Sequence, residues 1–231
     1  MTKTSLVLLI GVVAGGIAAT FGSGRAVAQT PAEAAAAVRS GPFSQLFNVG
    51  SVYVVKDKDF DPAEPKIRFG SVWIDHPNQG ALEVAVRYCV PEADIAQEGA
   101  SLAEMTLLDN QNPLVKITKV VSTSSASETQ VRAPQYTPPV VIAPYITPYT
   151  GLWGGGYVAD PGSYTPAIDC SAGATRFDLA PVISKIASLP NRTLQVQLLF
   201  SNGSVQNWQL GSKTVQALKS LPEIKRLNSK I

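Results

Sequence analysis

The stretch "ALEVAVRYCV", residues 81–90, decides the fold, because its side chains alternate in character along the chain. An alternation of period two is typical of a β-strand with one buried face. One face would carry Leu82, Val84, Val86 and Tyr88, and the other Glu83, Ala85, Arg87 and Cys89. The pattern therefore predicts a strand that covers an apolar core and turns Cys89 away from it.

Further strands are predicted on both sides of this one. The candidate segments are rich in valine, isoleucine and aromatic residues, and clusters of Asp, Asn, Pro and Gly separate them. They are "VGSVYVV" (49–55), "KIRFGSVWID" (66–75), "EMTLL" (104–108) and "PLVKITKVV" (113–121). The chain from 47 to 121 is thus expected to form antiparallel sheet.

A hairpin is predicted over residues 192–210, "RTLQVQLLFSNGSVQNWQL". A two-residue loop, Asn202-Gly203, would mix apolar and polar residues on each face. A three-residue loop, 201–203, places Val196 opposite Trp208 and puts Gly203 at the left-handed position that such loops require. The same register sets Leu194 opposite Leu210, and we favour it.

Short helices are expected at three places. Thr30, Pro31 and Glu33 form a capping-box pattern that starts a helix ending near Gly41. Two more, at 178–189 after Asp178 and at 212–221, follow the helical period. The predicted fold is β-rich α+β: a sandwich-like antiparallel sheet with two or three short helices and a long Pro/Tyr-rich extended loop. The expected division is a 29–46 N-terminal segment and a single 47–231 domain with an insertion at 122–169. Within the insertion, the Ser/Thr-rich stretch 122–129 is expected to be a polar linker.

Residues 1–28 resemble a secretory signal peptide. Lys3 precedes an apolar run from Leu6 to Phe21, and small residues lead to Ala28, where cleavage is expected. The competing interpretation is an uncleaved anchor, but the run is short and holds three glycines. We therefore expect export to a periplasm, another extracytoplasmic lumen or the exterior, with membrane contact only before cleavage.

The charge balance argues against nucleic acid as a partner. Cleavage after Ala28 removes Lys3 and Arg25 from 19 basic residues and leaves 17 against 17 acidic ones. A formally neutral protein lacks the strongly basic face that nucleic acid or an anionic membrane surface attracts.

The chain has two cysteines, Cys89 and Cys170. In an oxidising compartment the simplest inference is a disulfide between them, with Cys170 brought in by a crossing loop. The alternative is a pair of free thiols with a redox or metal role. It is disfavoured because there is no CxxC motif and only one histidine.

The segment 133–166 has an unusual composition. It holds seven prolines, five glycines, Trp153, five of the seven tyrosines and one charged residue, Asp160. Its proline-rich part contains Ala-Pro-x-x-Thr-Pro twice, at 133–138 and 143–148, which favours an extended ribbon. The candidate binding residues are Tyr136, Tyr145, Tyr149, Trp153, Tyr157 and Tyr164.

Three interpretations of 133–166 remain open. The segment could cover its own domain, act as an arm that binds a partner, or form an aromatic flap over a ligand. Long segments without regular structure are usually functional or disordered, and the aromatic content disfavours disorder.

The catalytic inventory is thin. His76 lies in the turn sequence "DHPNQG", and no nucleophile motif accompanies it. Asp57, Asp59 and Asp61 begin like a calcium loop, but Pro62 and Arg68 stand where glycine and glutamate are needed. We predict no catalytic residue, metal or cofactor.

The expected function is therefore non-enzymatic: an exported cell-envelope protein that binds a protein partner through 133–166. The first alternative is a module that binds a glycan or small apolar ligand on the aromatic residues. The second is a hydrolase that uses the acidic residues at 57–64 with His76.

Overall fold

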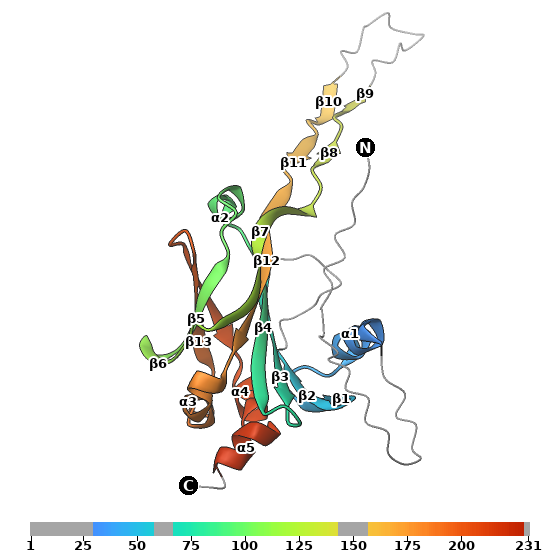
Figure 1. Cartoon of the computed structure of the whole chain (residues 1–231). Coiled ribbons are helices and arrows are strands. Elements are labelled where there is room, and N and C mark those ends of the chain that lie inside the picture. The colour runs from blue at the N-terminus through green and yellow to red at the C-terminus, as the bar shows by residue number, and fades with distance from the viewer. Residues whose placement is uncertain (1–29, 58–66, 143–156, 229–231) are drawn as a thin grey trace, which may run out of the picture.

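The structure is a computed structural model, and it describes residues 30–57, 67–142 and 157–228. It is rich in strands, with antiparallel sheets and a few short helices, which confirms the β-rich α+β class (Figure 1). The predicted signal peptide lies outside the described residues.

The larger sheet has six strands in the order β1-β2-β3-β4-β12-β7, all antiparallel to their neighbours. Its strands are β1 (Leu46–Val49), β2 (Val52–Lys56), β3 (Arg68–His76), β4 (Ala81–Val90), β12 (Ile168–Asp178) and β7 (Val120–Arg132). The stretch at 81–90 thus lies inside this sheet, between β3 and β12.

The smaller sheet has four strands in the order β14-β13-β5-β6. Its strands are β5 (Leu102–Asp109), β6 (Asn112–Ile117), β13 (Leu194–Phe200) and β14 (Val205–Leu210). The hairpin register is confirmed: Val196 pairs with Trp208, and Leu194 pairs with Leu210. Gly203 has φ of 88° in the connecting loop, a conformation that glycine adopts without a steric penalty.

The main core lies between the two sheets. The apolar face predicted for β4 is buried, with Leu82, Val84, Val86 and Tyr88 at most 3% exposed. Residues of the smaller sheet such as Met105 and Val196 belong to the same cluster. Burial of two facing apolar surfaces is the main force that holds such a sandwich together.

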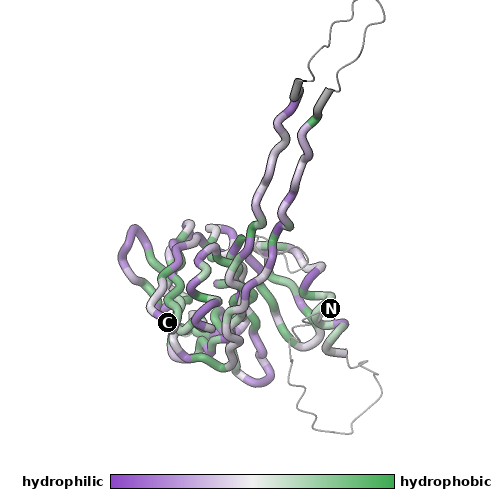
Figure 2. The backbone as a smooth tube through the Cα atoms, turned by 90° about the horizontal axis from the view of Figure 1, so that it is seen from above, coloured by the Kyte–Doolittle hydropathy of each residue, from purple (hydrophilic) through white to green (hydrophobic). Residues whose placement is uncertain are grey.

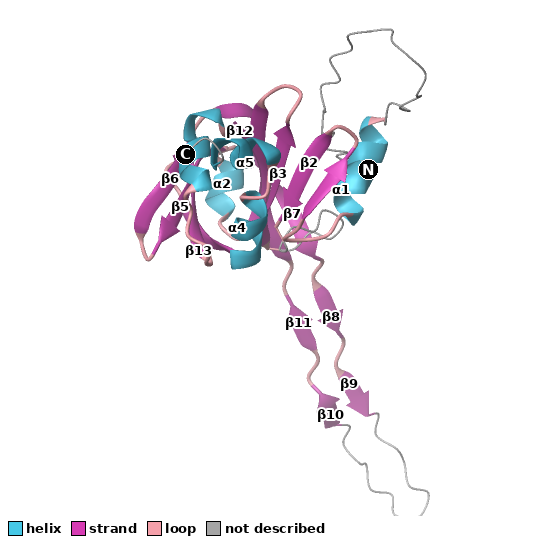
Figure 3. Cartoon of the chain, turned by 90° about the horizontal axis from the view of Figure 1, so that it is seen from below, coloured by secondary structure: helices cyan, strands magenta, loops and turns pink. Residues whose placement is uncertain are grey.

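Short helices close the ends of the sandwich. Figure 1 places α3, α4 and α5 at the end opposite the protruding strands and α2 at the end from which those strands leave, and Figure 3 shows the helices against the magenta strands of the body. The helices are α2 (Ala93–Gln97), α3 (Ile183–Ala187), α4 (Ser212–Leu218) and α5 (Pro222–Asn228). The expected helix at 178–189 is shorter than predicted, because a 3-10 turn at Ala180–Val182 precedes α3.

Helix α1 (Pro31–Ser40) covers the outer face of the larger sheet and has the predicted capping box at Thr30 and Glu33. Its Val38 packs on a second apolar cluster that includes Val54 and Val72. The buried Lys56 Nζ donates to the Val38 and Arg39 carbonyl oxygens, at 3.1 and 2.8 Å. A cation here complements the carboxyl-terminal end of the helix dipole.

Two expectations for the middle of the chain are wrong. The Ser/Thr-rich stretch 122–129, expected as a linker, belongs to strand β7. The strand expected at 113–121 ends at Ile117, and the chain turns into β7 after two residues. Strand β12, which pairs with both β4 and β7, was not anticipated either.

Candidate functional site

A two-stranded arm protrudes from the sandwich where β7 and β12 leave the body (Figure 1). We call residues 133–142 and 157–166 the arm. Strand β8 (Gln135–Thr137) pairs with β11 (Ser163–Thr165), and β9 (Val140–Ile142) pairs with β10 (Tyr157–Asp160). Figure 2 shows these two segments of the chain running side by side away from the body. The extended segment is therefore a paired ribbon in its described part.

One register runs along most of the arm. Arg132 pairs with Ile168, Tyr136 with Tyr164, and Val140 with Asp160. The antiparallel register is therefore the same at these three positions. In this register two pairs of prolines face each other, and a fifth proline faces a glycine. The facing positions are Pro134 and Pro166, Pro139 and Pro161, and Pro138 and Gly162.

The arm has a joint, which we define as Pro138, Pro139, Asp160, Pro161 and Gly162. Gly162 has φ of 76°, and its N–H donates to Asp160 Oδ1 at 2.9 Å. A Cβ on Gly162 would lie 2.6 Å from the Thr137 carbonyl oxygen and 2.8 Å from the Pro139 nitrogen. Both the backbone conformation and the close approach of the facing strand therefore require glycine.

Two of the six candidate binding residues lie directly opposite each other. Tyr136 and Tyr164 are cross-strand partners, and they are 68% and 67% exposed. Directly opposed side chains lie on the same face of a ribbon, with their Cβ atoms about 5 Å apart. The structure thus brings these two tyrosines together on one exposed face.

The other candidates are described less fully. Tyr157 pairs through its backbone with Ile142, and its side chain lies outside the described part of the chain. Tyr145, Tyr149 and Trp153 lie outside the described residues altogether.

The described part of the arm does not cover its own domain. No arm residue whose side chain is described is buried, and residues 133–140 are all exposed. The interpretation of this part as a covering loop is therefore wrong, and the partner-binding and ligand-binding interpretations remain.

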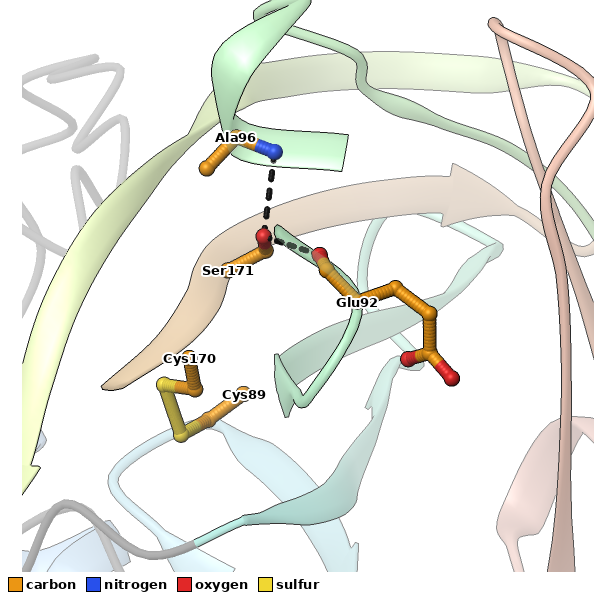
Figure 4. The surroundings of a disulfide bond; sticks show 5 residues. All are labelled: Cys89, Glu92, Ala96, Cys170 and Ser171. Carbon is orange, nitrogen blue, oxygen red and sulfur yellow. Dashed lines mark hydrogen bonds between the residues drawn. A yellow bond between two sulfur atoms is a disulfide. The ribbon is translucent and has the colours of Figure 1, made fainter. Parts of the chain in front are cut away.

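The disulfide between Cys89 and Cys170 is present, with a Cα–Cα distance of 5.3 Å (Figure 4). Both cysteines are buried, at 8% and 3% exposure. No crossing loop brings Cys170 to Cys89, because Cys170 lies on β12, the neighbouring strand, two positions before Ala172, the direct partner of Cys89. The bridge therefore joins β4 to β12 near the root of the arm.

A hydrogen-bonded serine holds α2 against the same root. The buried Ser171 hydroxyl donates to the Glu92 carbonyl oxygen at 2.5 Å and accepts from the Ala96 N–H at 3.0 Å (Figure 4). Sequence reasoning missed this contact, because a single serine in a strand carries no signal of its long-range partner.

Asp75, the residue before His76, is buried and hydrogen-bonded to helix α5. The buried Asp75 carboxylate accepts the Glu223 N–H at 2.8 Å, at the start of α5. Burial raises the pKa of Asp75, and the Glu223 charge raises it further, whereas the hydrogen bond from the Glu223 amide lowers it. His76 is the last residue of β3, and the side chain of Asp75 is engaged with α5.

Asp57 is also buried, and its carboxylate accepts the Thr214 hydroxyl at 3.4 Å. The remaining acidic residues proposed for catalysis, between 58 and 64, lie outside the described residues. Within the described ranges, no group of three His, Cys, Asp or Glu side chains is arranged to hold a metal ion.

No described helix has the length and apolar character needed to cross a membrane. The disulfide is compatible with an exported protein. Comparisons with protein-family models, with curated proteins and with solved structures gave no match to this chain.

Proposed function

We propose that this is an exported interaction protein of the cell envelope, and that the arm binds a protein partner. The sandwich would act as a rigid support that holds the arm away from its surface. In this proposal the protein has no catalytic role.

One observation carries the proposal. Of the exposed large apolar side chains in the described chain, the three with the highest exposure are on the arm: Tyr136 at 68%, Tyr164 at 67% and Val140 at 55%. Exposed apolar residues scattered singly are ordinary, whereas a group of them on a protruding element is typical of an interaction site. Tyrosine is also enriched where interfaces concentrate their binding energy.

The construction of the arm supports the same proposal. Its prolines and the Gly162 turn restrict the backbone before any partner arrives, which lowers the conformational entropy lost on binding. The disulfide and the Ser171 hydrogen bonds fix the strands from which the arm emerges. A stiff arm on a fixed root suits recognition better than a disordered linker would.

The test removes the arm without disturbing the body. Because Arg132 pairs with Ile168, residues 133–167 can be replaced by Asn-Gly, which forms a two-residue hairpin turn at this point of the ladder. We expect the armless protein to unfold at nearly the same denaturant concentration as the intact protein. We also expect it to lose the protein that intact bait captures from envelope extracts.

Equal capture by the armless and intact proteins would contradict the proposal. The double variant Gln135→Ala/Thr165→Ala serves as the control, because it changes a neighbouring residue pair of the same ladder and leaves Tyr136 and Tyr164 in place.

A second candidate function is supported by the tyrosine pair. Tyr136 and Tyr164 lie side by side and exposed, an arrangement on which a sugar ring could stack. Titration with a panel of oligosaccharides should then change tyrosine fluorescence in the intact protein but not in Tyr136→Ser/Tyr164→Ser. Equal fluorescence changes in both proteins would exclude this site as the binding surface.

A further inference from the structure

The arm lacks a second layer. An isolated two-stranded ribbon is only marginally stable in water, and it is normally stabilised by further strands or by packing on another element. The body does not supply that layer, because residues 133–140 are exposed along their whole length. The arm therefore gains stability from any surface that covers one of its faces.

Further strands cannot readily add to the arm's edges. Pro134, Pro138 and Pro139 on one strand, and Pro161 and Pro166 on the other, have no backbone N–H to donate. The register also shifts at Val131 and at Ala159, which indicates bulges on either side of the β8–β11 ladder. Prolines and bulges are the features that keep edge strands from pairing with other chains. Association through the arm is thus restricted to its faces.

The face that carries Tyr136 and Tyr164 is suited to an identical face. The arm's described residues include one charged side chain, Asp160, which lies beyond the β8–β11 ladder at the joint. The β8–β11 ladder itself carries no charge, so two such ladders meet without like-charge repulsion, and a tyrosine hydroxyl both donates and accepts hydrogen bonds. The described surface that best matches the arm's apolar chemistry is another arm, because the three most exposed large apolar side chains lie there.

We infer that the partner of the arm is a second copy of this chain, and that two arms pack face to face through Tyr136 and Tyr164. The inference rests on the proposed function, because it uses the same arm and names its partner. A two-fold axis would bring each ribbon against the other as the second layer of a small sandwich. Because a two-fold contact uses the same face of both copies, and the edges are blocked, this association closes at a dimer.

The experiment compares self-association of three proteins by sedimentation equilibrium over about two decades of micromolar concentration. They are the intact protein, produced by export so that its disulfide forms, the variant Tyr136→Ser/Tyr164→Ser, and the control Gln135→Ala/Thr165→Ala. Both changes are on the arm, so the fold of the body is preserved, and circular dichroism checks this. We expect the intact protein and the control to dimerise, and the tyrosine variant to dimerise with a dissociation constant raised by about tenfold or more.

Three outcomes would overturn the inference. The first is an intact protein that stays monomeric throughout, and the second is a dimer that the tyrosine substitutions leave unchanged. The third is arm-dependent binding of the monomer to phosphatidylethanolamine–phosphatidylglycerol vesicles, which would assign the face to a lipid surface. If the protein stays monomeric but its arm captures a different envelope protein, the dimer is refuted and the proposed function still stands.

Discussion

At the scale of single residues, the absence of a side chain at Gly173 leaves room for the buried ring of Tyr88. The two residues are cross-strand partners on β4 and β12, and a Cβ on Gly173 would lie 2.6 Å from Tyr88 Cζ. The Tyr88 ring also packs edge-on against Phe200, with centroids 4.9 Å apart, so it has little room to move. Glycine at 173 thus allows the two sheets to share one aromatic contact.

Gly173→Ala should therefore destabilise the body. The added methyl group must displace a buried ring, and overpacking of this kind costs about 1 to 3 kcal/mol. Urea unfolding measures the loss. Gly80→Ala is the comparison, because Gly80 has φ of 61° but no atom near the position of an added Cβ. A Gly173→Ala protein as stable as the original would show that the ring is not confined.

The buried Tyr88 should also make the free energy of unfolding depend on pH. Burial raises the pKa of Tyr88 to about 12, although the backbone N–H of Leu102 lowers it in part. An unfolded tyrosine titrates near 10, so the folded state retains its proton at pH values where the unfolded state has lost it. The stability due to this group is complete below about pH 10 and is lost as pH rises through about 12, by at most about 3 kcal/mol.

The measurement is urea unfolding at about pH 9 and about pH 11.5. We expect the drop in unfolding free energy between these values to be smaller in Tyr88→Phe than in the original protein. Identical drops in the two proteins would contradict the assignment of this titration to Tyr88.

At the scale of elements, the joint in the arm depends on Gly162. Gly162→Ala should disrupt the joint, because the new Cβ would meet the backbone of Thr137 and Pro139. We expect amide hydrogens of β9 and β10 to exchange at least about tenfold faster, while those of β4 and β13 keep their rates. Unchanged exchange in β9 and β10 would show that the glycine is dispensable there.

The elements also show how far the sequence predicts the fold. Strand β4 and the β13–β14 hairpin were predictable, because alternation and an apolar cross-strand pair such as Leu194 and Leu210 fix a register locally. Strand β7 was not, since its side chains are mostly exposed on both faces and show no alternation. Strand β12 was not predictable, because the small residues around Gly173 give no strand pattern. The need for glycine at 173 depends on Tyr88, which is distant in the sequence.

The candidate site was predictable only in composition. The prolines and tyrosines of 133–166 identified the segment, and proline favoured an unpaired extended chain. The pairing of Tyr136 with Tyr164 was missed because it depends on a ladder that begins in the body, at β7 and β12. The turn signal "DPG" at 160–162 could have suggested the joint, but not the strand that faces it.

At the scale of the whole molecule, the disulfide constrains a large part of the chain. Cys89 and Cys170 are 81 residues apart, and they enclose β5, β6, β7 and the whole arm. Closing a loop of this length in the unfolded chain is worth about 4.5 kcal/mol on the chain-entropy model. The bridge therefore stabilises the folded state by restricting the unfolded chain, and in the folded protein it joins two strands near the arm root.

The variant Cys89→Ser/Cys170→Ser should lose up to about 4.5 kcal/mol of unfolding free energy, measured by urea at neutral pH. Reduction of the original protein with dithiothreitol should give a similar loss. A loss below about 1 kcal/mol in both experiments would mean that the sandwich alone fixes the arm root.

The central claim is that the body holds the arm out to a protein partner. A photo-crosslinking residue such as p-benzoylphenylalanine, placed in turn at Tyr136, Tyr164 and the exposed body residue Val205, tests this claim in living cells. We expect a discrete protein adduct, to a second copy or to another envelope protein, from positions 136 and 164 but not from 205. Absence of an adduct from both arm positions, or the same adducts from all three, would contradict the claim.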